Sequence, residues 1–274
     1  VPVTSTTDNS SVRFDKTPPT ATLSYSSPGP YHKDQLITID AEFSEQMLSS
    51  INPKLNIHPV QGGESSECIM NWLTDNSSRC EFRINEGDTE VFVILHDSTD
   101  LVGNLITSTP TSGGQFDIDD NPPTADIKFI SSMGNAYPGP YRQGGDNLTV
   151  EVTFSEEMKS IPTLDFYGIF TGSDLALSLI DALNNRYEYV LTIPSGNGDV
   201  FINLNGKDLA DNDVILNPTS EDNFTLDNTA PSGSLTFSSP GAQNGYTNTT
   251  SVNIQFTAQD AFGISRYLTR WTMH

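Results

Sequence analysis

The chain has 274 residues, enough for about two ordinary domains of roughly 100 to 200 residues each. Acidic side chains number 35 against 13 basic ones, and the formal charge of -22 repels phosphate backbones, so nucleic acid is not an expected partner. No apolar run approaches the roughly 20 residues that cross a bilayer. The first residues also lack the basic lead and apolar block of a signal peptide. We therefore expect a soluble chain without membrane insertion in this segment.

Three copies of one sequence pattern divide the chain: "FDKTPPTATLSYSS", "IDDNPPTADIKFISS" and "LDNTAPSGSLTFSS". Their aspartates Asp15, Asp119 and Asp227 recur at intervals of 104 and 108 residues. A fixed period indicates tandem structural units. Each copy also contains segments in which apolar and polar residues alternate, such as "LITIDAEF", "LTVEVTF" and "SVNIQF". This period of two predicts half-buried β-strands.

Further alternating segments, "CEFRI", "EVFVIL", "YEYVLTI" and "DVFINL", bring each complete copy to about seven short strands separated by turn residues. We interpret Ser173 to Leu183, "SDLALSLIDAL", as a strand plus turn and not as a helix. The fold class predicted is therefore all-β, with tandem immunoglobulin-like antiparallel β-sandwiches arranged as a string or rod. A barrel of similar size is the alternative.

The copies also predict the domain boundaries. Residues 1–14 align with the segments that close the two complete copies, so we interpret them as the last strand of a preceding domain. Complete immunoglobulin-like domains are predicted for residues 15–118 and 119–226, and residues 227–274 form the N-terminal half of another. The expectation is an internal piece of a longer array, in which each unit contacts only its neighbours.

The motif "VTFSEEM", followed by "KDLADND" or "TDLVGN" and then by "FTLDNTAP", resembles the immunoglobulin-like repeats of bacterial and archaeal cell-surface proteins, namely large adhesins and S-layer proteins. The resemblance implies a non-enzymatic, extracellular structural protein at the cell surface. Its implied partners are neighbouring immunoglobulin-like domains of the same longer chain and copies of itself in a surface lattice. The stalk of a large adhesin and the accessory modules of a secreted polysaccharide-active enzyme remain alternatives, because one fold serves many roles.

Acidic residues gather in three elements that an immunoglobulin topology brings to one end of each domain: the linker, the "FSE" strand end and the loop before the last strand. Such oxygen ligands suit a hard cation with about six to eight ligands, which predicts structural Ca2+. The linker "DIDDNPP" is also similar to the acidic linkers of cadherins, where calcium stiffens neighbouring domains. Ordinary turn chemistry is the alternative. The predicted ligands are Asp15, Glu45, Asp97, Asp100 and Asn104 at the first junction, Asp119, Asp120, Glu156, Asp208, Asp211 and Asn212 at the second, and Asp227 and Asp260 at the third.

Cys68 and Cys80 flank a turn sequence, "TDNSS", and an exported chain meets oxidising conditions, so we predict a disulfide across a hairpin. Paired free thiols are the alternative. Sequons make the chain a candidate glycoprotein, and their asparagines are Asn9, Asn76, Asn147, Asn223 and Asn248.

Catalysis has little support in the sequence. The histidines are scattered without metal-ligand spacing, and no nucleophile elbow, phosphate-binding loop or zinc-helix motif is present. We therefore expect no enzyme activity. Trp72 and Trp271 raise a weaker hypothesis of glycan stacking.

Overall fold

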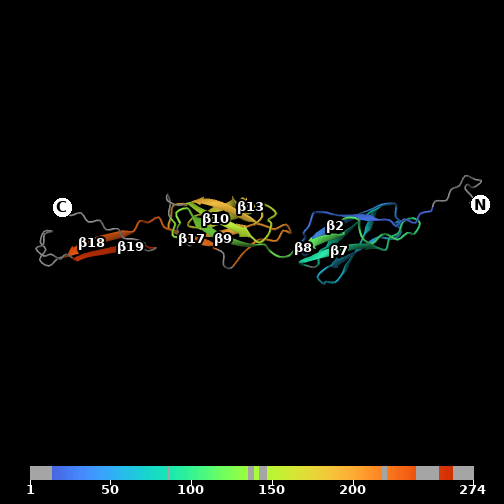
Figure 1. The fold of residues 1–274 in the computed structure, drawn as a ribbon, viewed down its shortest axis with the longest axis horizontal. Coiled ribbons are helices and arrows are strands. Elements are labelled where there is room, and N and C mark those ends of the chain that lie inside the picture. Colours follow the sequence, from blue (N-terminus) through green and yellow to red (C-terminus); the bar gives the residue numbers. More distant parts are fainter. Residues whose placement is uncertain are drawn as a thin grey trace, which may run out of the picture. The chain divides into compact units, whose positions relative to one another are not determined.

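The structure is a computed structural model that describes residues 14–85, 87–134, 139–141, 147–217, 221–238 and 253–261. Every regular secondary-structure element among these residues is a β-strand, which confirms the all-β prediction (Figure 1). In the same part of the chain, no helix is long and apolar enough to cross a membrane. The chain divides into two compact units: Val1–Pro123 with Lys207–Asp213, and Thr124–Gly206 with Val214–His274.

The first unit contains two four-stranded antiparallel sheets, with strand orders β1-β2-β6-β5 and β4-β3-β7-β8. Alternation along β2 buries Ile37 and Ile39, and alternation along β7 buries Val91 and Val93, so both sheets contribute to one core. Each such side chain contributes roughly 1.5 to 3 kcal/mol by burial. The strands are β1 Ala21–Tyr25, β2 Leu36–Phe43, β3 Lys54–Pro59, β4 Ser66–Ile69, β5 Asn71–Thr74, β6 Ser77–Arg83, β7 Thr89–His96 and β8 Gln115–Ile118.

The second unit repeats this sandwich-like arrangement, with strand orders β13-β14-β10-β9-β16 and β12-β11-β15-β17 around its own core. The strand pairs of these two sheets are antiparallel, as predicted, except that the two-residue strand β16 pairs parallel to β9. The strands are β9 Thr124–Ser131, β10 Asn147–Phe154, β11 Thr163–Gly168, β12 Gly172–Ala176, β13 Ser178–Asp181, β14 Arg186–Thr192, β15 Gly198–Asn205, β16 Ile215–Leu216 and β17 Asn223–Leu226.

In both units the chain passes from one sheet to the other between two short strands. Met70 lies between β4 and β5, and Leu177 lies between β12 and β13. Both side chains are buried, and the amides of Met70 and Leu177 donate to the carbonyls of Pro53 and Pro162. The segment Ser173 to Leu183 is therefore two strands with a change of sheet between them, where the sequence predicted one strand and a turn.

The disulfide between Cys68 and Cys80 is confirmed, but its predicted place across a hairpin is wrong. Cys68 lies on β4 and Cys80 on β6, and these strands belong to different sheets. The hairpin in this segment is instead formed by β5 and β6. Because the chain changes sheet at Met70, the disulfide links the two sheets of the first unit.

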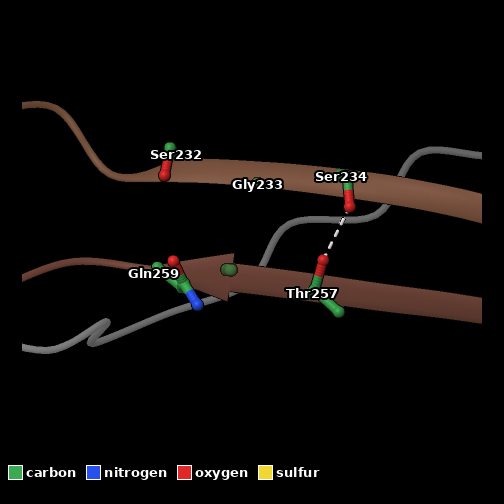
Figure 2. Close-up of a pocket in the computed structure, with 6 residues that line it drawn as sticks. Ser232, Gly233, Ser234, Thr257 and Gln259 are labelled. Carbon is green, nitrogen blue, oxygen red and sulfur yellow. Dashed lines mark hydrogen bonds between the residues drawn. The ribbon is translucent and has the colours of Figure 1, made fainter.

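Strands β18 (Ser232–Ser238) and β19 (Asn253–Gln259) form an antiparallel ribbon in the third copy of the pattern. The hydroxyls of Ser234 and Thr257 lie 2.7 Å apart across it, in a shallow surface hollow (Figure 2). Leu235 and Phe256 each remain about half exposed. A two-stranded ribbon is at best marginally stable alone.

Candidate metal centre

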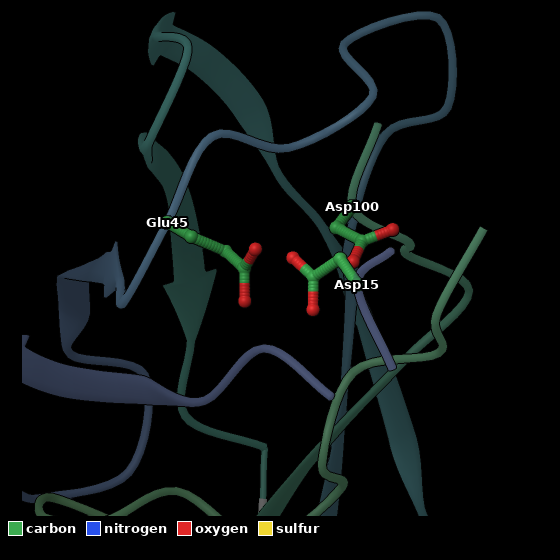
Figure 3. A group of neighbouring side chains, drawn as sticks. All are labelled: Asp15, Glu45 and Asp100. Carbon is green, nitrogen blue, oxygen red and sulfur yellow. The ribbon is translucent and has the colours of Figure 1, made fainter. Parts of the chain in front are cut away.

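Three carboxylates from distant segments of the first unit lie close together (Figure 3). Asp15 precedes β1, Glu45 follows β2, and Asp100 lies in the loop after β7. One carboxylate oxygen of each residue lies within 4.8 Å of those of the other two. These positions are the linker, the "FSE" strand end and the loop before the last strand, which are the elements that supply the predicted ligands of the first junction.

The loop after β7 holds the carboxylate of Asp100 in a fixed orientation. Its Oδ1 accepts the backbone N–H groups of Val102, Gly103 and Asn104 at 2.9, 2.8 and 2.9 Å, and its Oδ2 accepts Asn104 Nδ2 at 2.7 Å. Gly103 has a φ of 97°, in the region that favours glycine. Burial acts to raise the pKa of Asp100, but the hydrogen bonds from Asn104, Val102 and Gly103 outweigh it and lower the pKa from its ordinary value.

Glu45 experiences the opposite effect. Burial raises its pKa, and the negative charges of Asp15 and Asp100 raise it further. No ion pair found among the described residues includes these three carboxylates. The cluster therefore concentrates negative charge that a bound cation would offset, and its oxygen-only donors fit a hard cation such as Ca2+.

Hydrogen bonds also hold the segment before β1 near this cluster. Asn104 Nδ2 donates to the Asp15 carbonyl at 3.4 Å, while the amide of Thr17 donates to Asp15 Oδ1 at 2.9 Å. Four residues after Asp15, the Pro19 carbonyl accepts the amide of Thr107 at 2.8 Å. The loop after β7 and the chain that enters the unit are thus already in contact.

A second loop repeats the geometry of the first. Asp208 is buried, its Oδ1 accepts the Asn212 amide at 2.9 Å, and its Oδ2 accepts Asn212 Nδ2 at 2.9 Å. Asn212 Nδ2 also donates to the Asp119 carbonyl at 2.9 Å, as Asn104 does to Asp15. Glu156, the sequence equivalent of Glu45, belongs to the other unit, where it directly follows Ser155 after β10.

Two other predicted ligands of these junctions have different neighbours. The carboxylate of Asp97 lies 3.5 Å from Lys54 Nζ and 3.3 Å from His96 Nδ1. Its hydrogen bond with His96 is the main cause of its lowered pKa. Asp120 Oδ1 accepts the amide of Lys33, and the Asp120 amide donates to the carboxylate of Asp88.

The remaining predicted ligands lie in turns. Asp211 has a φ of 74°, and its carbonyl accepts Lys207 Nζ at 2.9 Å. The carboxylate of Asp227 accepts the amide of Thr229, whereas Asp260 directly follows β19. Among the described residues, neither Asp227 nor Asp260 belongs to a group of three or more side chains close enough to hold a metal ion.

Sequon asparagines occupy a turn and strand starts. Asn76 lies in the turn between β5 and β6, where its Nδ2 donates to Glu42 Oε1 at 3.0 Å, and Asn147 and Asn223 begin β10 and β17. Asn9 and Asn248 lie outside the described residues.

Trp72 is a structural residue in the first unit, because its ring packs 5.3 Å from that of Phe43 and its Nε1 donates to the Ile51 carbonyl. The weaker hypothesis of glycan stacking therefore gains no support at this position. Trp271 lies outside the described residues.

Comparison with protein-family models and with curated proteins gives no match. Sequence reasoning selected the acidic residues but missed the backbone amides of Val102, Gly103 and Asn104, which hold Asp100 in place. The recurrence of an aspartate followed four residues later by an asparagine, in "DLVGN" and "DLADN", is the signal that points to them.

Proposed function

We propose that this chain is part of a non-enzymatic extracellular structural protein, in which tandem immunoglobulin-like repeats form a calcium-stiffened rod within a surface layer or surface filament. The main support is the convergence of Asp15, Glu45 and Asp100 from three segments on one oxygen-rich cluster. The repeated sandwich-like units and the disulfide agree with such a role, since disulfides persist in oxidising, extracellular surroundings.

Calcium would act by fixing the chain segment that enters each repeat. Asp15 lies on that segment, whereas Glu45 and Asp100 belong to the body of the unit, so a shared ion would tie one to the other. Like charges a few ångströms apart repel by about 1 kcal/mol or more at a protein surface. An ion converts this repulsion into attraction.

The expected gain from calcium is modest at each site. Extracellular calcium modules bind at about 0.1 to 1 mM, so millimolar calcium adds roughly 1 to 2 kcal/mol per site. The sequence gives the next repeat the same three acids, Asp119, Glu156 and Asp208, and the proposal extends to them. Repeated along an array, a small gain at each linker stiffens the whole array.

The direct test measures calcium binding and shape together. Isothermal titration of the chain with Ca2+ should detect millimolar or tighter sites, and Glu45→Gln should remove one of them. Asp97→Asn is the matched control, because it neutralises a nearby carboxylate that is already paired with Lys54 and His96. Small-angle X-ray scattering should then show a rod that becomes shorter and more flexible when calcium is chelated.

Absence of calcium binding, or a scattering profile that chelation leaves unchanged, would overturn the calcium-stiffened rod. A lattice protein should in addition assemble from purified material. The stalk of a large adhesin would stay monomeric and elongated, and accessory modules of a secreted polysaccharide-active enzyme would accompany a catalytic domain.

A further inference from the structure

The outer face of the sheet β12-β11-β15-β17 presents two stacked aromatic rings. Tyr167 on β11 and Phe201 on β15 are direct cross-strand partners, with ring centroids 5.4 Å apart and ring planes inclined by 20°. Tyr167 is 51% exposed and Phe201 is 38% exposed. The neighbouring residues Phe166 and Ile202 point to the opposite face of the sheet and are buried in the core. A single exposed aromatic residue is ordinary, but a stacked pair forms a continuous apolar surface in contact with water.

Amide and carboxylate groups border these rings on one side. Asp165 and Asn203 are the next outward cross-strand pair, and Asn205 lies one step further along β15. Asn205 Nδ2 donates to Asp165 Oδ2 at 2.9 Å, and Asn203 Nδ2 donates to Asn205 Oδ1 at 3.0 Å. The hydrogen bonds hold these polar groups in one orientation beside the aromatic pair.

Polar groups also border the opposite side of the rings. Asn223 on β17 is the direct partner of Phe201, so it extends the aromatic row onto a third strand. In the neighbouring row, Thr225 Oγ1 donates to Asp199 Oδ1 at 2.7 Å. The aromatic surface therefore lies between two polar margins on strands β11, β15 and β17.

We propose that this face binds a neutral pyranose polysaccharide. A pyranose ring has an apolar face of C–H groups and an equatorial rim of hydroxyls, which matches an aromatic surface bordered by fixed hydrogen-bonding groups. The carboxylates of Asp165 and Asp199 would repel phosphates and uronic acids, so neutral sugars fit better than nucleic acids or acidic glycans. This binding role goes beyond the structural function and does not depend on calcium.

The first unit supplies an internal control at the same positions of its sheet. His58 and Phe92 are the cross-strand partners that correspond to Tyr167 and Phe201. The next pair there is Asn56 with Ile94, where the second unit has Asp165 with Asn203. At these positions the first unit therefore pairs an imidazole with a phenyl ring, and the apolar Ile94 replaces one residue of the polar border.

The proposal can be tested by affinity electrophoresis of the full chain. The gels contain a soluble β-glucan, a xylan, a galactomannan or polygalacturonate. We expect at least one neutral polysaccharide to retard the chain and polygalacturonate to have no effect. Tyr167→Ala and Phe201→Ala should each raise the dissociation constant obtained from the retardation about tenfold or more, as for aromatic anchors in other interfaces. Tyr167→Phe should retain binding, because it keeps the ring, and Phe92→Ala should leave binding unchanged.

Thermal unfolding of each variant shows whether it is folded before its binding is compared. The absence of retardation by all three neutral polysaccharides would overturn the proposal, as would retardation that is equal in Tyr167→Ala, Phe201→Ala and the unaltered chain. Concentration-dependent self-association that these two substitutions abolish, without polysaccharide retardation, would instead identify the face as a contact between copies of the chain.

Discussion

Cys68 and Cys80 join the two sheets of the first unit, whereas the equivalent register positions of the second unit hold Leu175 and Tyr189. Both of these side chains are partly buried and pack against the second core. The Tyr189 ring lies 6.0 Å from that of Phe166. Side chains that pack against the core thus occupy the positions that the disulfide occupies in the first unit, so the same register positions serve two different chemistries.

The strand register establishes this equivalence. In each unit, the first residue of the pair faces the leucine at the second position of strand β3 or β11. The second residue of the pair faces the residue that lies four positions before the phenylalanine of "FSE". These partners are Leu55 with Cys68, Leu164 with Leu175, Ile39 with Cys80 and Val150 with Tyr189.

Removal of the disulfide should have the largest effect that this comparison predicts. Cys68→Ala with Cys80→Ala opens a loop of about 13 residues and should lower the free energy of unfolding of the first unit by about 3 kcal/mol, because the unfolded chain gains freedom. Calorimetry should show one transition moving to lower temperature while the second unit's transition stays in place.

The reciprocal variant sharpens this prediction. Leu175→Ala with Tyr189→Ala should destabilise only the second unit, by lost burial and not by loop entropy. Reducing agent should therefore act on the unaltered first unit and leave the second one unchanged. A shift of both transitions by reductant would contradict the separate roles of the two pairs.

The loop aspartates should show the next largest effect. Asp100 accepts four hydrogen bonds, from the amides of Val102, Gly103 and Asn104 and from Asn104 Nδ2, whereas two from Asn212 are found on Asp208. With calcium chelated, Asp100→Ala should lower the melting temperature of its unit by about 5 to 10 °C, because four hydrogen-bond donors of the loop lose their acceptor.

Asp208→Ala should lower the melting temperature by less, since the hydrogen bonds described for its carboxylate are the two from Asn212. Thermal unfolding in chelator measures both variants without any contribution from bound calcium. Equal shifts, or a larger shift for Asp208→Ala, would show that the hydrogen bonds to Asp100 do not set the stability of its loop.

Some of these features were accessible from the sequence and others were not. Alternation at Ile37 and Ile39 predicted a buried strand because side chains of a strand alternate between two faces. The recurrence of Asp100 as Asp208 located the two loops. The change of sheet at Met70 was not predictable, because alternation shows which face a residue occupies but not which sheet its strand joins.

The same limitation applies to Asp97. Its contacts with Lys54 and His96 depend on the register between β3 and β7, in which Lys54 faces His96. The sequence places Asp97 only three residues before Asp100, so spacing alone grouped the two carboxylates. Their surroundings differ because the chain turns between them, at a φ of 58° on Asp97.

Backbone conformation in the two loops gives the smallest predicted effect. Gly103 and Asp211 occupy the same loop position, with φ values of 97° and 74°. A Cβ atom added at Gly103 would meet no atom within 4 Å, so backbone strain determines the cost of alanine there. Gly103→Ala should destabilise the first unit by about 1 kcal/mol, and Gly103→Asn by less, because asparagine tolerates this conformation.

Asp211→Gly tests the same position in the other loop, where the substitution also removes the attraction between the Asp211 carboxylate and Lys207. Glycine relieves the strain of a positive φ but gains freedom in the unfolded chain, and an exposed ion pair contributes little, so the net change should stay within about 1 kcal/mol. Chemical denaturation of Gly103→Ala and Asp211→Gly measures both free energies. A loss of more than about 1 kcal/mol in Asp211→Gly, beyond what glycine entropy explains, would show that the Asp211 carboxylate stabilises its loop and that the two loops differ in more than backbone strain.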